Sequence, residues 1–280
     1  WGNLLVPGLG ATLRGHPAMG IQEAVLELGT YYGGTLGVRE GAFTIDGNVN
    51  IPSKGNVYKP ILGEALQEFG LKYHFYNTFY HYQQSSLAIE NADREKNNEQ
   101  KLYKGDWKDT FAAPFAWKNL ENPWVYPVIL GSSAIIAYNY HHQAIGRIHV
   151  KSDSLSDSTF GIAQMGLIPF GGLFGEETLF RGFIQREVQG QTHSLALSIL
   201  SESLLFAMIH PPQLRASAFA SGIYYGFLTH HFDGNLEPGM ALHFWVNVVD
   251  GVFSYFLFRR AQGKSAPWPP PISAQLEVPF

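Results

Sequence analysis

Charged and hydrogen-bonding side chains stand at a few positions within three apolar stretches of this sequence. These positions are Glu176, Glu177 and Arg181 in the first stretch, His210 at the end of the second, and His243 and Asn247 in the third. An ionised side chain among apolar groups is costly unless it is paired or used in function. We therefore take these residues as candidates for a functional site.

Three pairs of residues in these stretches share a spacing of four positions. The pairs are Glu177 with Arg181, Phe206 with His210, and His243 with Asn247. Residues four apart lie on the same face of a helix. The spacing predicts three helices that direct carboxylate, imidazole and carboxamide groups toward one another inside a bundle.

This set of groups suits the hydrolysis of a peptide or ester carbonyl. A carboxylate that is desolvated among apolar groups has its pKa raised toward neutrality, and beside an imidazole it can take a proton from a bound water. We assign the base to Glu176 and the orientation of the water to His210. His243 and Asn247 would donate N–H groups to the oxyanion that develops on the attacked carbonyl.

Other acidic and basic residues in these stretches have structural explanations. Glu177 and Arg181 suit a fixed ion pair that holds the catalytic helix and leaves no unpaired buried charge. Glu202 and Asp250 suggest only structural hydrogen bonding. Taken singly, His210 before two prolines could interact with a helix dipole, and His243 could be a satisfied core histidine. Their joint occurrence in successive apolar stretches favours a site.

The three motifs resemble those of a known family. They are Glu-Glu-x-x-x-Arg in "EETLFR" at 176–181, Phe-x-x-x-His in "FAMIH" at 206–210, and His-x-x-x-Asn in "HFWVN" at 243–247. In this order they resemble the signatures of the CAAX protease and bacteriocin-processing family (CPBP, also called Abi), which are intramembrane endopeptidases. The resemblance covers about residues 160 to 258.

The resemblance implies the same roles that the residue types suggest. Glu176 and His210 would activate the water, and His243 and Asn247 would form the oxyanion site. It implies membrane-associated or prenylated substrates. Members of the family have also been described as metalloproteases, so zinc is possible, with Glu176, His210 and His243 as its ligands. The chain lacks the His-Glu-x-x-His spacing of many zinc enzymes at these positions, which favours a route without a cofactor.

Composition excludes several other classes of protein. The 280 residues carry a net charge of -4 and no patch rich in Lys or Arg, so nucleic acid is not an expected partner. There is no cysteine, which excludes disulfides, thiolate metal sites and a cysteine nucleophile. The mean hydropathy of -0.07 is low for a chain buried throughout in lipid, and fits a chain with one polar part and one membrane part.

We expect an all-α fold, a polytopic transmembrane helical bundle with a polar segment in its N-terminal half. Apolar runs at 123–140, 159–175, 194–209, 213–232 and 240–258 are each near the length that a bilayer requires. The expected parts are possible membrane-associated helices at 1–40, a polar segment in water at 41–122, a membrane-embedded protease domain at 123–260 and a Pro-rich tail at 261–280. A buried soluble helical core is the alternative explanation of the apolar runs.

Two patterns in the N-terminal half predict local structure. Leu62, Leu66, Phe69, Tyr73, Tyr76 and Tyr80 recur at steps of three and four, which predicts an amphipathic helix with a packing face. Glu23 and Glu27, four positions apart, are interpreted as a solvated helix face.

The sequence predicts an integral membrane protein, of the cell (inner) membrane, whose partners are the lipid bilayer and a membrane-anchored peptide or protein substrate. Its function would be that of an intramembrane endopeptidase. Two alternatives stay open: a non-catalytic membrane scaffold or immunity-type protein, and a soluble zinc-dependent hydrolase. The identity of the substrate does not follow from the sequence.

Overall fold

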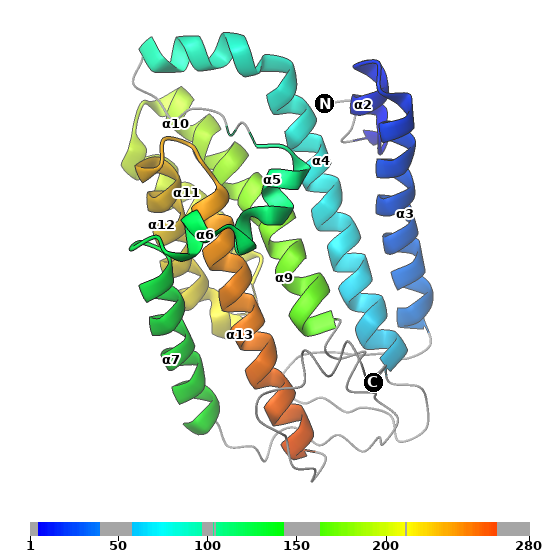
Figure 1. The fold of residues 1–280 in the computed structure, drawn as a ribbon, viewed down its shortest axis with the longest axis vertical. Helices are drawn as coiled ribbons and strands as arrows, with labels where there is room; N and C mark the ends of the chain where they lie inside the picture. The colour runs from blue at the N-terminus through cyan, green and yellow to red at the C-terminus, as the bar shows by residue number, and fades with distance from the viewer. Residues whose placement is uncertain are drawn as a thin grey trace. The chain divides into compact units, whose positions relative to one another are not determined.

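The computed structural model describes residues 5–39, 58–96, 103, 105–142, 163–210 and 212–261, and within these ranges every regular element is a helix (Figure 1). This confirms the predicted all-α class. The helices are α2 (Leu9–Leu13), α3 (Pro17–Arg39), α4 (Tyr58–Lys96), α5 (Trp107–Ala112), η1 (Ala113–Phe115), α6 (Trp117–Leu120), α7 (Tyr126–His142), η3 (Ala163–Leu167), α9 (Ile168–Gly171), η4 (Gly172–Gln185), α10 (Arg186–Thr192), α11 (Leu195–Met208), η5 (Pro212–Leu214), α12 (Arg215–His231) and α13 (Glu237–Ala261).

The chain divides into two compact units. The first comprises Trp1–Val25, Lys72–Tyr126 and Gly172–His243, and the second comprises Leu26–Leu71, Pro127–Gly171 and Phe244–Phe280. Helices α3, α4, α7 and α13 contribute residues to both units. Most of the candidate site residues fall in the first unit, and Asn247 falls in the second.

The first unit contains an unusual helix, η4, which carries the Glu-Glu-x-x-x-Arg motif. It is a π-helix, whose backbone hydrogen bonds join residues five apart rather than four. Most π-helical segments are single turns inserted in α-helices, often at functional sites, whereas this one spans 14 residues. The sequence predicted a helix here, but nothing in it predicted the π form.

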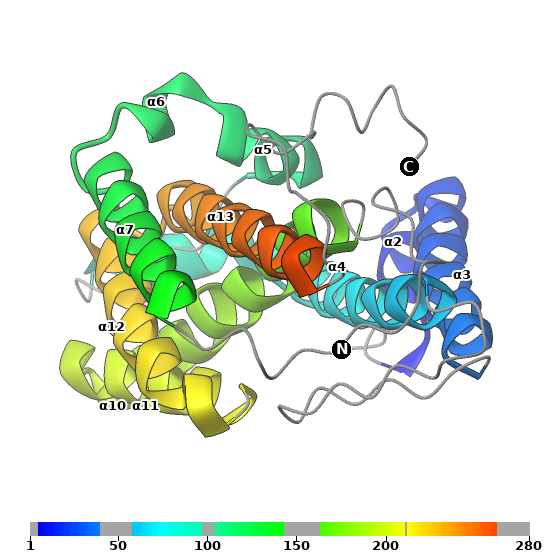
Figure 2. The same ribbon diagram turned by 90° about the horizontal axis from the view of Figure 1, so that it is seen from below.

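Helices α11 and α12 pack side by side, as both ribbon views show (Figures 1 and 2). Gly222 and Gly226, four residues apart on α12, allow this close approach. A Cβ atom at position 222 would lie 2.9 Å from the Cα of Ser203, and one at 226 would lie 2.6 Å from Oε1 of Glu202. The small residues of α12 thus let its backbone approach α11 closely.

Local signals fix the ends of two helices that carry site residues. The Ser194 hydroxyl caps α11 by accepting a hydrogen bond from the amide of Leu197, 3.3 Å away. The side chain of Asn235 accepts a hydrogen bond from the amide of Glu237, where α13 begins, at 3.0 Å. In each case a side chain just before the helix accepts a hydrogen bond from a backbone amide near the helix start.

Four of the apolar runs form the helices α7, α11, α12 and α13. The run at 159–175 is helical from residue 163 onward, in η3, α9 and the start of η4, and its residues 159–162 lie outside the described part of the chain, as do residues 143–158 and 262–280. Within the described residues, however, no helix combines the length and the hydropathy that crossing a membrane requires. The predicted helices are present, and the predicted spans are not found among them.

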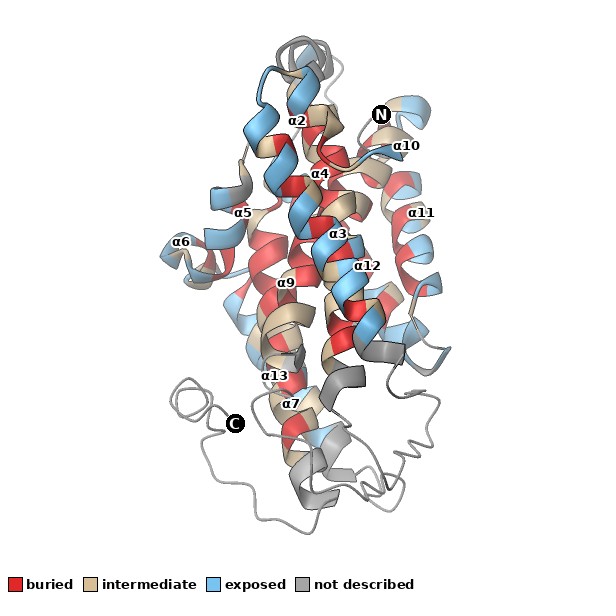
Figure 3. Ribbon diagram, turned by 90° about the vertical axis from the view of Figure 1, so that its right-hand side faces the viewer, coloured by how far each residue is buried: buried red, intermediate tan, exposed pale blue. Residues whose placement is uncertain are grey.

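Large apolar side chains are nevertheless exposed on α11, along which Figure 3 shows exposed residues in pale blue. They are Leu197, Leu200, Leu204, Leu205 and Met208. Their spacing places them on one face of the helix, opposite the residues that α11 buries.

A buried polar cluster in the first unit consists of Arg14, just after α2, Glu23 of α3 and His81 of α4. Glu23 and Glu27 are each only 3% exposed, so the predicted solvated face is wrong. Glu23 Oε2 lies 2.8 Å from Nε2 of His81, and Nη2 of Arg14 lies 2.5 Å from Nδ1 of the same ring. Because arginine can only donate, Nδ1 accepts and the neutral imidazole donates Nε2–H to Glu23.

We expect the variant His81→Ala to lower the free energy of unfolding by about 3–5 kcal/mol, because it leaves the buried Glu23 carboxylate without its hydrogen-bond donor. The measurement is the unfolding midpoint of the purified full chain in denaturant. Glu121→Gln, at an exposed position, is the control and should leave the midpoint nearly unchanged. Equal midpoints for His81→Ala and wild type would contradict a structural role for this cluster.

Candidate active site

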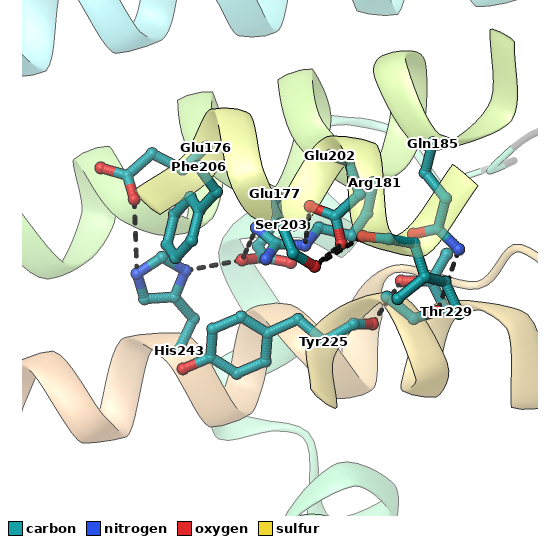
Figure 4. A network of polar contacts seen from close by, with 12 residues as sticks. Glu176, Glu177, Arg181, Gln185, Glu202, Ser203, Phe206, Tyr225, Thr229 and His243 are labelled. Atoms are coloured by element: carbon teal, nitrogen blue, oxygen red, sulfur yellow. Dashed lines mark hydrogen bonds and ion pairs between the residues drawn. The ribbon is translucent and has the colours of Figure 1, made fainter. Parts of the chain in front are cut away.

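The imidazole of His243 is held in a fixed orientation on α13. Its Nδ1 lies 2.6 Å from Oε1 of Glu177, a carboxylate that is fully buried (Figure 4). Because a carboxylate only accepts, Nδ1 carries the proton. The ring stacks on Tyr225 with centroids 5.2 Å apart, and Phe206 meets it edge-on at 6.0 Å. Hydrogen bond and packing together leave the ring one orientation.

Glu176 lies between His243 and a cation. Its Oε2 is 3.6 Å from Nε2 of His243, and its Oε1 is 2.5 Å from Nζ of Lys72 on α4. The sequence predicted a carboxylate surrounded by apolar groups, with a raised pKa. Burial does raise the pKa of Glu176, but the attraction of the Lys72 ammonium, together with His243, holds the pKa of this carboxyl below its usual range, so the predicted raised pKa is wrong.

His210 is oriented by the backbone of the preceding helix, α11. Its Nδ1 lies 2.7 Å from the carbonyl oxygen of Phe206, and its ring packs against that of Phe206 with centroids 4.6 Å apart. A carbonyl only accepts, so Nδ1 donates, and Nε2 keeps a lone pair. The imidazole is also close enough to Glu176 for a Coulombic interaction.

Arg181 bridges two buried glutamates. Its Nη1 lies 3.3 Å from Oε1 of Glu177 and its Nε lies 3.4 Å from Oε2 of Glu202, with all three side chains fully buried. The guanidinium also lies over the rings of Phe206 and Tyr225, at 4.4 and 5.0 Å from their centroids. The predicted ion pair of Glu177 and Arg181 is present, and Glu202 is a second carboxylate partner of Arg181.

The structure brings most of the candidate residues together in the first unit. They are Glu176, Glu177 and Arg181 from η4, Phe206 from α11, His210 just after it, and His243 from α13. Asn247 follows His243 by one turn of α13 and belongs to the second unit.

Sequence reasoning missed three contributors to this site. Lys72 is a single cation within the aromatic stripe of "LKYHFY", Tyr225 lies between the two glycines of α12, and Glu202 was given no role. Two of them had a signal in the sequence that could have indicated a site. For Lys72 it was a charge among aromatic residues, and for Tyr225 it was an aromatic residue between two glycines.

A group of side chains that could hold a metal is not found among the described residues. The zinc ligands considered from sequence, Glu176, His210 and His243, do not form one. Lys72 occupies one carboxylate oxygen of Glu176. We therefore derive no reaction step through a metal.

Residues 158–249 match the family model of type II CAAX prenyl endopeptidases, described as Rce1-like. Over this segment the chain is similar to the Rce1-like family. The match includes all three motifs and confirms the resemblance to the CAAX protease family over this part of the chain. The family implies a protease in general terms, and its members are membrane proteins. Comparison with curated proteins and with solved structures gives no match.

We expect Arg181→Met to lower the free energy of unfolding by about 3–5 kcal/mol, because it leaves two buried carboxylates uncompensated. Adding Glu202→Gln should recover part of that loss, since one of the two charges is then removed. The measurement is the unfolding midpoint of the single and double variants. A double variant that loses the sum of both single effects would contradict the bridging role of Arg181.

Proposed function

We propose that the protein is an intramembrane endopeptidase of the CAAX type, which hydrolyses a peptide bond of membrane-associated or prenylated substrates with a water activated by glutamate and histidine. The observation that carries the proposal is the line of contacts from Glu177 through His243 to Glu176 within the Rce1-like segment. Glu176, Glu177 and His243 lie in the first unit, and the hydrogen bond from Nδ1 to Glu177 fixes the orientation of the His243 ring.

Glu176 is the general base of the proposed reaction. Its ionised carboxylate accepts a proton from the attacking water, while Nε2 of His210, which keeps its lone pair, accepts the other hydrogen of that water. The lone pair of the water oxygen is then directed to the carbonyl carbon. As the tetrahedral intermediate collapses, the carbon–nitrogen bond breaks and Glu176 passes its proton to the leaving amine.

His243 and Asn247 are the proposed donors to the oxyanion. This role requires His243 as an imidazolium, which donates Nδ1–H to Glu177 and would donate Nε2–H to the oxyanion. Asn247, four residues further along α13, would add its amide N–H groups. Arg181 acts indirectly, because it fixes the carboxylate that orients His243.

The membrane part of the proposal rests on the family and on one surface. Members of the matched family are membrane proteins, and its description names prenyl endopeptidases. The exposed apolar face of α11, with Leu197, Leu204 and Met208, suits contact with lipid or with the lipid chain of a substrate. We place the protein in the cell (inner) membrane.

The central test compares wild type with Glu176→Gln in lipid vesicles that contain a prenylated C-terminal peptide. We expect the variant to lose about 10²- to 10⁴-fold in kcat, because the amide cannot take a proton from water. Release of the C-terminal fragment is measured by mass spectrometry, and unprenylated peptide shows whether the lipid is needed. Glu121→Gln is the matched control at an exposed site.

A chelator arm separates the two routes to an activated water. We expect cleavage to be unchanged by the chelator; loss of cleavage that added zinc restores would contradict the metal-free route. Cleavage by Glu176→Gln at the wild-type rate would contradict the assigned base. If wild type cleaves no substrate offered, the result favours a non-catalytic scaffold.

The oxyanion assignment makes a separate prediction. We expect Asn247→Ala to lower kcat about 10²- to 10³-fold with little change in KM, because the lost donor acts mainly in the transition state. Initial rates over a range of peptide concentrations give both constants. Gln191→Ala, at an exposed position, is the control. A variant in which only KM rises would assign Asn247 to substrate binding instead.

A further inference from the structure

Helix α4 meets η4 at the residues that precede the catalytic glutamate. Phe174 packs edge-on against Tyr73 and Tyr76 of α4, with centroids 5.8 and 5.1 Å apart. At the next position, a Cβ atom on Gly175 would lie 2.6 Å from the Cα of Lys72 and 2.7 Å from its carbonyl oxygen. Only a residue without a side chain allows this approach, because the clash would be with backbone atoms.

The third consecutive residue, Glu176, receives the side chain of Lys72. Nζ lies 2.5 Å from Oε1, and the two side chains are only 14% and 10% exposed. The other carboxylate oxygen, Oε2, lies on the side of His243, at 3.6 Å from Nε2. Lys72 therefore holds one oxygen of the carboxylate while the other is presented to the site.

We propose that Lys72 is a positioning residue for the peptidase reaction, and that α4 is a working part of the catalytic centre although it lies outside the segment that matches the family. This inference rests on the proposed function of Glu176 as base. Three consecutive residues of η4 contact α4, so the placement of Lys72 is built into the packing of the two helices.

A cation at this position helps both halves of the reaction. Before attack, the ammonium keeps Glu176 ionised in a largely buried place, so that it can accept a proton. Once Glu176 is protonated, its attraction to the ammonium falls, which favours transfer of that proton to the leaving amine. A fixed carboxylate oxygen also keeps the base aligned with the water, and a misplacement of about 1 Å can cost about 10²-fold in rate.

The test measures kcat and KM for Lys72→Met and Lys72→Arg with prenylated peptide in vesicles. We expect Lys72→Met to lose about 10²-fold in kcat with KM nearly unchanged, and Lys72→Arg to keep most of the wild-type kcat because it retains the charge. Lys118→Met is the control: Lys118 is also paired with a glutamate, Glu237, but its side chain is 66% exposed. If Lys72→Met fails to fold, Lys72→Gln replaces it.

The outcomes distinguish this inference from the proposed function. If Glu176→Gln is inactive while Lys72→Met matches wild type, the role of Lys72 is overturned and that of Glu176 stands. Equal losses in Lys72→Met and Lys72→Arg, with lowered unfolding midpoints in both, would reduce Lys72 to a packing residue. If Glu176→Gln remains active, the proposed function fails, and the inference fails with it.

Discussion

The hydrogen bond between Glu177 and His243 is the interaction on which the site depends. It joins η4 to α13, and it decides which imidazole nitrogen faces Glu176. Burying the carboxylate of Glu177 is possible because Arg181 pairs with it, and Arg181 in turn is shared with Glu202. The aromatic rings around the guanidinium and the imidazole fill the remaining space. The groups that compensate the buried charges are thus the same groups on which the aromatic rings pack.

The sequence predicted the interactions that depend on local spacing. Glu177 and Arg181 are four residues apart, so their pairing follows from helix geometry, and the apolar runs predicted the helices α7, α11, α12 and α13. The contact of Glu177 with His243 was not predicted, because it joins two separate helices and no local pattern encodes the match. The same is true of Lys72, which reaches Glu176 from a helix much earlier in the chain.

Glu23 shows how a local rule fails. Two glutamates at a spacing of four are typical of a solvated helix face, yet α4 covers this one and supplies His81 as a partner. At Glu23 the structure is set by a tertiary contact that the local sequence does not contain. The π form of η4 was not predicted either, since no residue pattern in the segment distinguishes a π-helix from an α-helix.

The glycine at position 175 has a consequence for how relatives of this protein are judged. It belongs to none of the three motifs, and it leaves room for the backbone of α4. A homologue could keep every motif residue, gain one methyl group at this position, and push α4 away from the carboxylate. Such a chain would keep all three motifs and yet, on the proposed role of Lys72, lose the contact that positions Glu176. Surveys for active members should therefore examine the packing beside the motifs as well as the motif letters.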